Sequence, residues 1–367
     1  MKPTKRLQTA GQSIWLDNIT RDMLDDGTLR TYIDEDSVTG LTSNPSIFDA
    51  AIAGSETYDN DIRTLAGAAT PAEDIFFEIA LADLRRAADM FRAIHETTNG
   101  VDGWVSMEVS PLLATDTAGS IVAARNIRGK AQRQNLFVKI PGTREGLPAI
   151  EEAIFLGIPI NVTLLFSREQ YLGAAEAYLR GIERRLAGGM DPSVHCVASL
   201  FISRWDVAAN PQIPGELKNH LGIAIAGRTY CAYRELLASK RWQTLASRGV
   251  LPQRLLWAST GTKDPQAPDT LYVENLAAPD TINTMPDKTL RAFADHGVVT
   301  GKMEEDAREA ELILAEIARA KVDVDALAET LQLEGTRAFV KSWQQLLQRI
   351  DTKARASKGM APAAAAL

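Results

Sequence analysis

The sequence contains little cysteine and little histidine. Of its 367 residues two are cysteines, Cys196 and Cys231, and four are histidines, and no HxH, HxxxH or paired-cysteine spacing occurs. A disulfide framework needs cysteines in pairs and a metal site needs clustered ligands, so neither is expected. Catalysis through a bound metal is therefore disfavoured, no cofactor is expected, and His195 is interpreted as a packed or surface residue.

Long apolar runs and an excess of basic charge are also missing. No stretch of 18 uncharged apolar residues occurs, and the basic residues near position 1 are not followed by the apolar segment of a signal peptide. Lys and Arg total 40 against 47 Asp and Glu, a formal net charge of -7, and no basic block is present to neutralise a nucleic-acid backbone. We therefore expect a cytoplasmic protein, a monomer or a homodimer, that binds neither nucleic acid nor membrane.

The two common nucleotide-binding motifs are absent as well. No GxGxxG follows the first apolar run, and no GxxxxGK[ST] occurs anywhere. Segments 72–96 and 167–187 place apolar residues three and four apart, as amphipathic helices do. Such helical patterns follow eight short apolar runs, which are predicted as strands: 13–17, 37–44, 103–109, 136–140, 158–166, 194–202, 254–260 and 281–285.

Eight strands that alternate with helices predict a parallel sheet. The strand count favours a closed (β/α)8 barrel, the TIM barrel, and leaves an open doubly wound sheet as the alternative. Residues 302–350 are expected to form further amphipathic helices, and no linker rich in Pro, Gly and Ser divides the chain. The prediction is one domain over 1–353 that includes this helical extension, with 354–367 as a disordered tail.

Polar side chains stand at or near the ends of the predicted strands. In such barrels the carboxyl ends of the strands meet on one face, where the chemistry takes place, so these side chains are expected to converge. They comprise carboxylates, one strand lysine, amides, hydroxyls and further cations: Asp17, Asn44, Glu108, Lys139, Asn161, Thr163, Ser199, Arg204, Ser259 and Lys263.

Lys139 interrupts the apolar run 136–140. Burial disfavours its ammonium form, and the neutral amine is a nucleophile that forms an imine with a carbonyl carbon. The imine can accept the electrons of a neighbouring C–C bond, and the reaction needs acid–base groups such as Asp17 and Glu108. The alternatives are structural: a lysine that reaches solvent or pairs with Glu108, and an Asp17 that caps a helix.

The run 255–263, LLWASTGTK, leads from a strand into a loop of Ser, Thr and Gly that ends at Lys263. Hydroxyls, backbone N–H groups and an ammonium in one loop indicate an anion site, to which Arg204 can add a forked pair of donors. A phosphate is the expected anion. The alternative is ordinary turn chemistry.

Seven motifs carry a resemblance to a known family: TSNPSIF (42–48), SMEVS (106–110), VKIPGT (138–143), INVTLLFS (160–167), ASLFISRWD (198–206), WASTGTK (257–263) and NTMPDKTL (283–290). On these motifs the sequence resembles the transaldolases, class I Schiff-base enzymes of the pentose phosphate pathway. The motifs occur in the family's order, and the segment 302–350 resembles its C-terminal helices. The resemblance implies a (β/α)8 barrel in which Lys139 forms a Schiff base with a ketose phosphate, so sugar phosphates are the expected partners.

The resemblance also implies roles for the other strand-end residues. Asp17 would handle the proton of the substrate's C4 hydroxyl, while Glu108 and Thr163 would act through a water in forming and hydrolysing the imine. Lys263 is assigned a phosphate role from its position and charge, because another subgroup of the family has an arginine in this loop. Asn44, Asn161 and Ser199 would bind hydroxyl groups of the substrate. Arg204 and Ser259 would bind its phosphate.

The expected reaction moves a three-carbon dihydroxyacetone unit from a ketose phosphate (sedoheptulose 7-phosphate or fructose 6-phosphate) to an aldose phosphate (glyceraldehyde 3-phosphate or erythrose 4-phosphate). The nearest alternative is a fructose 6-phosphate aldolase, which shares the barrel and the lysine but releases free dihydroxyacetone. Those relatives are shorter and lack the glutamate on strand three, so Glu108 and the chain length argue against it. A catalytically silent sugar-phosphate-binding barrel is the other alternative, and it would form no covalent adduct.

Overall fold

A closed barrel of eight parallel strands forms the centre of the molecule, with the strands in sequence order and β8 paired with β1. The computed structural model describes residues 1–66, 70–299 and 301–356. The predicted (β/α)8 barrel is confirmed, and the open doubly wound alternative is wrong. The strands lie close to the predicted runs: β1 (Ser13–Asp17), β2 (Val38–Thr42), β3 (Trp104–Glu108), β4 (Leu136–Pro141), β5 (Ile160–Leu165), β6 (Cys196–Phe201), β7 (Gln253–Ala258) and β8 (Ile282–Met285).

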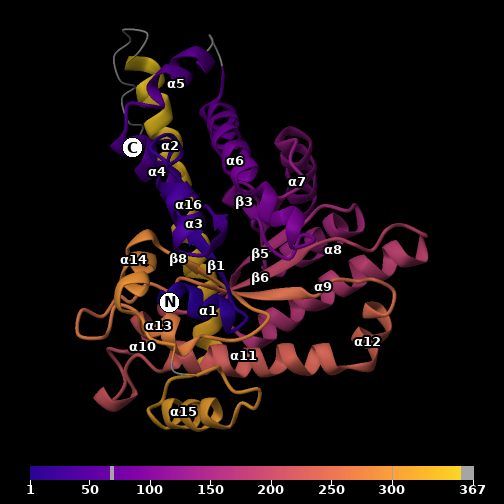
Figure 1. The fold of residues 1–367 in the computed structure, drawn as a ribbon, viewed down its shortest axis with the longest axis vertical. Helices are drawn as coiled ribbons and strands as arrows, with labels where there is room; N and C mark the ends of the chain where they lie inside the picture. Colours follow the sequence, from indigo (N-terminus) through magenta and orange to yellow (C-terminus); the bar gives the residue numbers. More distant parts are fainter. Residues whose placement is uncertain (67–69, 300, 357–367) are drawn as a thin grey trace.

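Helices follow the strands and surround the barrel (Figure 1). No helix among the described residues is long and apolar enough to cross a membrane. Before β4 the helices are α1 (Pro3–Thr9), α2 (Arg21–Asp25), α3 (Thr28–Glu35), α4 (Pro45–Gly54), α5 (Asp59–Leu65), α6 (Ala72–Thr97), the short 3-10 helix η1 (Pro111–Leu113) and α7 (Thr117–Ala131). Between β4 and β8 they are α8 (Gly146–Phe155), α9 (Arg168–Ala187), α10 (Ser203–Ala209), the 3-10 helix η2 (Gly215–Leu217), α11 (Leu221–Ala238), α12 (Lys240–Ala246) and α13 (Leu271–Asn275).

Side-chain caps set where several helices begin. The Ser167 hydroxyl accepts a hydrogen bond from the Gln170 amide at 3.1 Å at the start of α9, and the Asp116 carboxylate accepts one from the Gly119 amide at 2.9 Å at the start of α7. Each bond satisfies one of the amides that a first helical turn leaves unpaired. These caps keep the connections from strand to helix short, so the residues at the strand ends stay close to the barrel.

Three helices follow β8, α14 (Asp287–His296), α15 (Arg308–Arg319) and α16 (Val324–Ala356). The last two form the predicted helical extension. α15 packs on α11, and α16 packs on α4, α5 and α6 (Figure 1). α16 ends at Ala356, so residues 354–356 of the expected tail are helical, whereas 357–367 lie outside the described residues.

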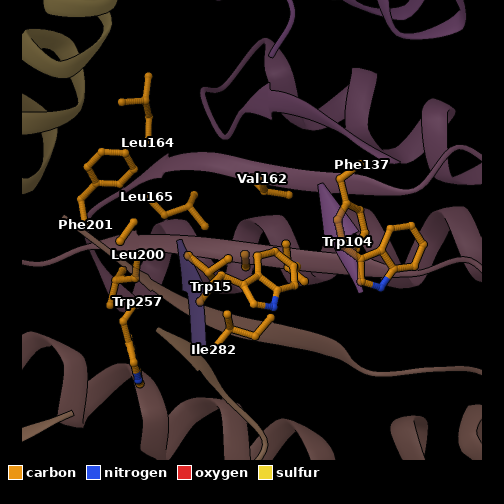
Figure 2. Close-up of a cluster of buried hydrophobic side chains, with 14 of the residues drawn as sticks. Trp15, Trp104, Phe137, Val162, Leu164, Leu165, Leu200, Phe201, Trp257 and Ile282 are labelled. Atoms are coloured by element: carbon orange, nitrogen blue, oxygen red, sulfur yellow. The ribbon is translucent and has the colours of Figure 1, made fainter. Parts of the chain in front are cut away.

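Aromatic rings fill the N-terminal end of the barrel interior. Phe137 stacks on Trp104 with ring centroids 4.0 Å apart, and its ring lies 6.1 Å from that of Trp15 (Figure 2). Strand side chains alternate between the two faces of the sheet, so residues two positions further along point to the same side. Asp17 and Lys139 follow Trp15 and Phe137 at this spacing, which places both polar side chains inside the barrel above the rings.

A buried ion pair joins several strands at the same N-terminal end. The carboxylate of Asp102 accepts hydrogen bonds from Ser13 Oγ at 2.6 Å and Trp15 Nε1 at 3.0 Å, and it lies 3.5 Å from Arg254 Nη1. Arg254 also donates to the Ser13 hydroxyl at 2.7 Å and to the Thr281 carbonyl at 3.0 Å. These contacts connect the starts of β1 and β7 with the chain before β3 and β8.

His195 lies at this end of the barrel as well. Its ring centroid is 4.9 Å from that of Trp104 and 6.4 Å from that of His95. Burial lowers the pKa of His195 to about 4, so its ring is neutral at neutral pH. The interpretation of His195 as a packed residue fits this environment.

Replacing Asp102 with alanine should destabilise the barrel. The change leaves Arg254 and the Trp15 indole N–H without their buried acceptor, so we expect the free energy of unfolding to fall by about 3–5 kcal/mol. Urea unfolding followed by tryptophan fluorescence measures the loss. Asp89→Ala removes an exposed ion pair with Arg133 and is the control, with an expected loss below about 1 kcal/mol. Equal losses in the two variants would contradict the role of Asp102.

Candidate active site

A cavity of about 590 Å³ opens at the C-terminal ends of the strands and is called the site cavity below. Glu108 and Asn161 do not line it but are buried behind its wall, with 5% and 0% of their surface exposed. No group of three His, Cys, Asp or Glu side chains within the described ranges is placed to hold a metal ion. The other predicted site residues all line the site cavity: Asp17, Asn44, Lys139, Thr163, Ser199, Arg204, Ser259 and Lys263.

Strand register brings three of the predicted residues to one level of the barrel. Lys139 on β4 is the Cα partner of Glu108 on β3 and of Asn161 on β5. Its Nζ lies 3.8 Å from Glu108 Oε2 and donates a hydrogen bond to the Ser43 carbonyl at 2.9 Å. Lys139 is only 5% exposed, so the alternative in which it extends to bulk solvent is wrong. Its pairing with Glu108 leaves the amine at the wall of the site cavity.

Burial raises the pKa of both carboxyl groups near this amine. Desolvation raises the pKa of Glu108 to about 7. Attraction by Lys139 lowers this pKa, and repulsion by Asp17 raises it further. Desolvation also raises the pKa of Asp17, while Lys139 and the Thr42 hydroxyl act in the opposite direction. A carboxyl group with a pKa near 7 takes up and releases protons readily at neutral pH, as general acid–base catalysis requires.

Asp17, the last residue of β1, is held by a chain of hydroxyl groups. Thr42 Oγ1 donates to Asp17 Oδ1 at 2.8 Å and lies 2.7 Å from Thr284 Oγ1. Asp17 does not cap the following helix, because the Thr20 hydroxyl accepts the hydrogen bond from the Met23 amide at the start of α2. The capping alternative is therefore wrong, and the carboxylate of Asp17 faces the site cavity.

Two polar groups beside the lysine lack a hydrogen-bonding partner among the described residues. Both carboxylate oxygens of Glu108 and the hydroxyl of Thr163 are buried without a hydrogen-bonding partner among the described residues. Thr163 is followed by Leu164 at φ 60°, where the pairing of β5 with β6 shifts register. A bulky residue in the left-handed region is strained. Strained backbone next to unsatisfied buried polar atoms is typical of a functional site.

The two predicted asparagines use their amide groups differently. Asn44 Oδ1 accepts from the Ile47 amide at 3.1 Å as the N-cap of α4, and its Nδ2 has no partner in the described part of the chain. Asn161 Oδ1 accepts from Ser199 Oγ at 2.7 Å, and its Nδ2 lies 3.3 Å from Ser106 Oγ. Asn44 therefore offers donors to the site cavity, whereas Asn161 reaches it only through Ser199.

A second part of the wall carries cations and hydroxyls. Ser259, at φ 56°, places its Oγ 2.9 Å from Ser203 Oγ. Neither Arg204 nor Lys263 forms an ion pair with any carboxylate of the described residues. Desolvation lowers the pKa of Arg204. Two cations that form no ion pair with a described carboxylate, beside two hydroxyls, are suited to a phosphate group.

Several residues of the cavity wall were not identified from the sequence. Thr42, Phe201 and Ser203 fall inside the motifs TSNPSIF and ASLFISRWD, and membership of these motifs could have identified them as site residues. Phe339 comes from α16, where an apolar residue in an amphipathic pattern looks like any core residue. The lining residues that the sequence analysis did not single out include Thr42, Ser46, Phe201, Ser203, Thr284, Pro286 and Phe339.

Comparison with known sequences shows the family to which the chain belongs. The sequence model of the family described as Transaldolase/Fructose-6-phosphate aldolase matches residues 14–350. The chain belongs to this family. Proteins named transaldolase are similar to it: one from Thermobifida fusca (strain YX) is 44% identical, with 95% of this chain and 97% of the relative covered. A transaldolase of Arthrobacter sp. (strain FB24) is 45% identical over 95% and 96% of the two chains, and one of Thiobacillus denitrificans (strain ATCC 25259 / T1) is 44% identical over 95% and 100%.

For this member of the transaldolase family, Glu108→Gln should stabilise the fold at high pH. The pKa of Glu108 rises from an ordinary 4.5 to about 7 on folding, so the native state holds the extra proton between these values. The wild type therefore loses stability as the pH rises through that window, and glutamine removes the loss. We expect the variant to be more stable by about 1–3 kcal/mol at pH 8 and nearly equal at pH 5.

Urea unfolding of both proteins at the two pH values measures this difference. Glu334→Gln, at an exposed position of α16, is the matched control and should show no dependence on pH. A stability difference for Glu108→Gln that is the same at both pH values would contradict the raised pKa.

Proposed function

We propose that this protein transfers a dihydroxyacetone unit between sugar phosphates through a Schiff base on Lys139. The observation that carries the proposal is the buried amine of Lys139 at the cavity wall, with Glu108 3.8 Å away and Asp17 lining the same cavity. Membership of the family and relatives named transaldolase support the same activity. The substrates of this proposal are ketose and aldose phosphates.

In the capture step the neutral amine of Lys139 adds to the C2 carbonyl carbon of a ketose phosphate, and a proton passes from the nitrogen to the carbonyl oxygen to give the carbinolamine. The departing hydroxyl leaves as water while the nitrogen lone pair forms the C=N bond, and its proton comes from protonated Glu108 through a bound water. The hydroxyl of Thr163 helps to hold this water. A pKa of about 7 lets Glu108 act as an acid here and as a base when the imine is hydrolysed.

In the cleavage step the carboxylate of Asp17 takes the proton of the C4 hydroxyl. The C3–C4 bond breaks, its electrons pass to the iminium carbon to form an enamine, and C4 leaves as the aldehyde of the first aldose phosphate. The enamine then attacks the aldehyde of a second aldose phosphate, and Asp17 returns the proton. Sedoheptulose 7-phosphate and glyceraldehyde 3-phosphate would in this way give erythrose 4-phosphate and fructose 6-phosphate.

The remaining residues of the site cavity are proposed to bind substrate. Arg204 and Lys263 form no ion pair with a described carboxylate, and the hydroxyls of Ser203 and Ser259 lie beside them. These groups support a phosphate site on that part of the wall. Asn44 would donate to a substrate hydroxyl, and Asn161 would orient the Ser199 hydroxyl for the same purpose. The proposed phosphate ligands are Arg204, Ser259 and Lys263, with Ser203 added from the structure.

The setting of this activity is also a proposal. We expect one domain over 1–353 in the cytoplasm, as a monomer or a homodimer; Cys196 and Cys231 are both free thiols, and α16 packs on the helices of the barrel. Analytical ultracentrifugation distinguishes the two assembly states.

Borohydride reduction in the presence of fructose 6-phosphate should fix the substrate covalently on Lys139. Mass spectrometry of the digested protein locates the added mass. The Lys139→Ala variant should fold but carry no label, and Lys130→Ala, which changes an exposed lysine, should be labelled like the wild type. Absence of label from Lys139 in the wild type would refute the Schiff base and favour a silent binding barrel.

The family description also names fructose-6-phosphate aldolase, which a second experiment separates from a transaldolase. Fructose 6-phosphate alone should release at most one dihydroxyacetone unit per enzyme, because the bound enamine waits for an acceptor aldehyde. Glyceraldehyde 3-phosphate, the aldehyde that fructose 6-phosphate loses on cleavage, and free dihydroxyacetone are both measured by coupled enzyme assays. Steady release of dihydroxyacetone without an acceptor would overturn the choice of transaldolase.

A further inference from the structure

The C-terminal helix α16 contributes a side chain to the site cavity. Phe339 is 9% exposed and lines the cavity together with Lys139 and Arg204. Its ring centroid lies 6.4 Å from that of Phe201, the last residue of β6, at an interplanar angle of 60°. Figure 2 shows Phe201 at the side of the hydrophobic cluster away from Trp104 and Phe137. Two aromatic rings from distant parts of the chain therefore meet at one part of the wall.

The guanidinium of Arg204 lies against both rings. Its Cζ is 5.2 Å from the ring centroid of Phe201 and 5.9 Å from that of Phe339, the geometry of two cation–π contacts. Arg204 makes no hydrogen bond or ion pair with any other described residue. Aromatic contacts engage the flat face of a guanidinium and leave its N–H groups available at the edge. The rings thus orient Arg204 without using the donors that would bind an anion.

The backbone of α16 also approaches Arg204 closely, at Gly335. A Cβ atom built on this glycine would lie 3.1 Å from Arg204 Nη1 and 3.0 Å from Leu164 Cδ2. Glycine inside a helix costs about 1 kcal/mol relative to alanine. The close approach explains why this position suits glycine: a methyl group would displace the guanidinium, which lies against the two rings, by a few tenths of an ångström.

A third residue of the helix fixes it to the strand ends. Gln332 Nε2 donates to the Gly142 carbonyl at 3.1 Å and to the Leu164 carbonyl at 3.0 Å. Gly142 follows the end of β4, the strand of Lys139, and Leu164 comes directly after Thr163 near the end of β5. Gln332, Gly335 and Phe339 are spaced three and four apart, so they share one side of α16, called the α16 site face below.

We propose that Phe339 is a positioning residue that, with Gly335, holds the Arg204 guanidinium in the orientation that binds the substrate phosphate. The α16 site face would then set the preference of the enzyme for phosphorylated over unphosphorylated aldehydes. This inference rests on the proposed role of Arg204 as a phosphate ligand. Gln332 holds the helix at the distance from β4 and β5 that the contact requires.

The test compares two acceptors with saturating sedoheptulose 7-phosphate as the donor: glyceraldehyde 3-phosphate and unphosphorylated glyceraldehyde. We expect Phe339→Leu to lower kcat/KM for glyceraldehyde 3-phosphate about tenfold, mainly through KM, because a cation–π contact of a desolvated arginine is lost. For glyceraldehyde the change should stay below about twofold. The inhibition constant of inorganic phosphate should rise by the same factor as KM.

Matched variants separate positioning from packing. Phe339→Tyr keeps the aromatic ring and should retain the preference for the phosphorylated acceptor. Gly335→Ala should lower this preference, because the added methyl displaces Arg204. Leu333→Ala, at a 52% exposed position of the same helix, should behave like the wild type. Equal losses for both acceptors in Phe339→Leu, with an unchanged inhibition constant for phosphate, would show a packing role and overturn the inference.

The Arg204→Ala variant distinguishes failure of this inference from failure of the proposed phosphate site. It should lower kcat/KM for glyceraldehyde 3-phosphate about a hundredfold, and adding Phe339→Leu to it should cost nothing more in acceptor preference. If Arg204→Ala alters neither acceptor preference nor phosphate inhibition, the phosphate role of Arg204 is refuted, and the inference is refuted with it. If Arg204→Ala alters both and Phe339→Leu alters neither, only the inference is refuted.

Discussion

The pairing register of β3, β4 and β5 places Glu108, Lys139 and Asn161 at one level inside the barrel, where water is largely excluded. The Lys139 amine lies 3.8 Å from the buried carboxyl group of Glu108, and desolvation raises the pKa of Glu108 to about 7 against the attraction of this amine. A shift of one residue in either pairing would turn one of these side chains to the outer face, because strand side chains alternate. The chemistry of the site therefore depends on hydrogen bonds between backbone atoms far from any substrate.

The two ends of the barrel satisfy their polar groups in different ways. At the N-terminal end the carboxylate of Asp102 has three partners and both Nη atoms of Arg254 have hydrogen-bond acceptors, so this end contributes stability. At the C-terminal end Glu108 and Thr163 are buried without hydrogen-bonding partners among the described residues, and Arg204 packs against two aromatic rings without a hydrogen bond or ion pair to any of those residues. Such unsatisfied groups cost stability, and they are concentrated where a substrate can bind them.

The helical extension takes part in the site rather than only covering the barrel. α16 packs on α4, α5 and α6, and its Gln332 binds carbonyls at the ends of β4 and β5 (Figure 1). The same side of the helix brings Phe339 to the cavity and Gly335 to Arg204. Tethering to the barrel helices along its length gives this single helix a fixed position over the strand ends.

The sequence by itself determined the eight strands and the barrel, and it identified eight of the residues that line the site cavity, among them Lys139 and Asp17. Apolar runs, helical spacing and residue type are local properties, and the rule that strand ends converge supplied the rest. Only the tertiary structure decided that Asn161 lies behind Ser199 and that Phe339 reaches Arg204. The physical reason is that these contacts join residues far apart along the chain. An apolar residue on an amphipathic helix has the same local pattern whether it packs on the core or on an active-site arginine. Closure of the barrel and docking of α16 determine which of these contacts forms.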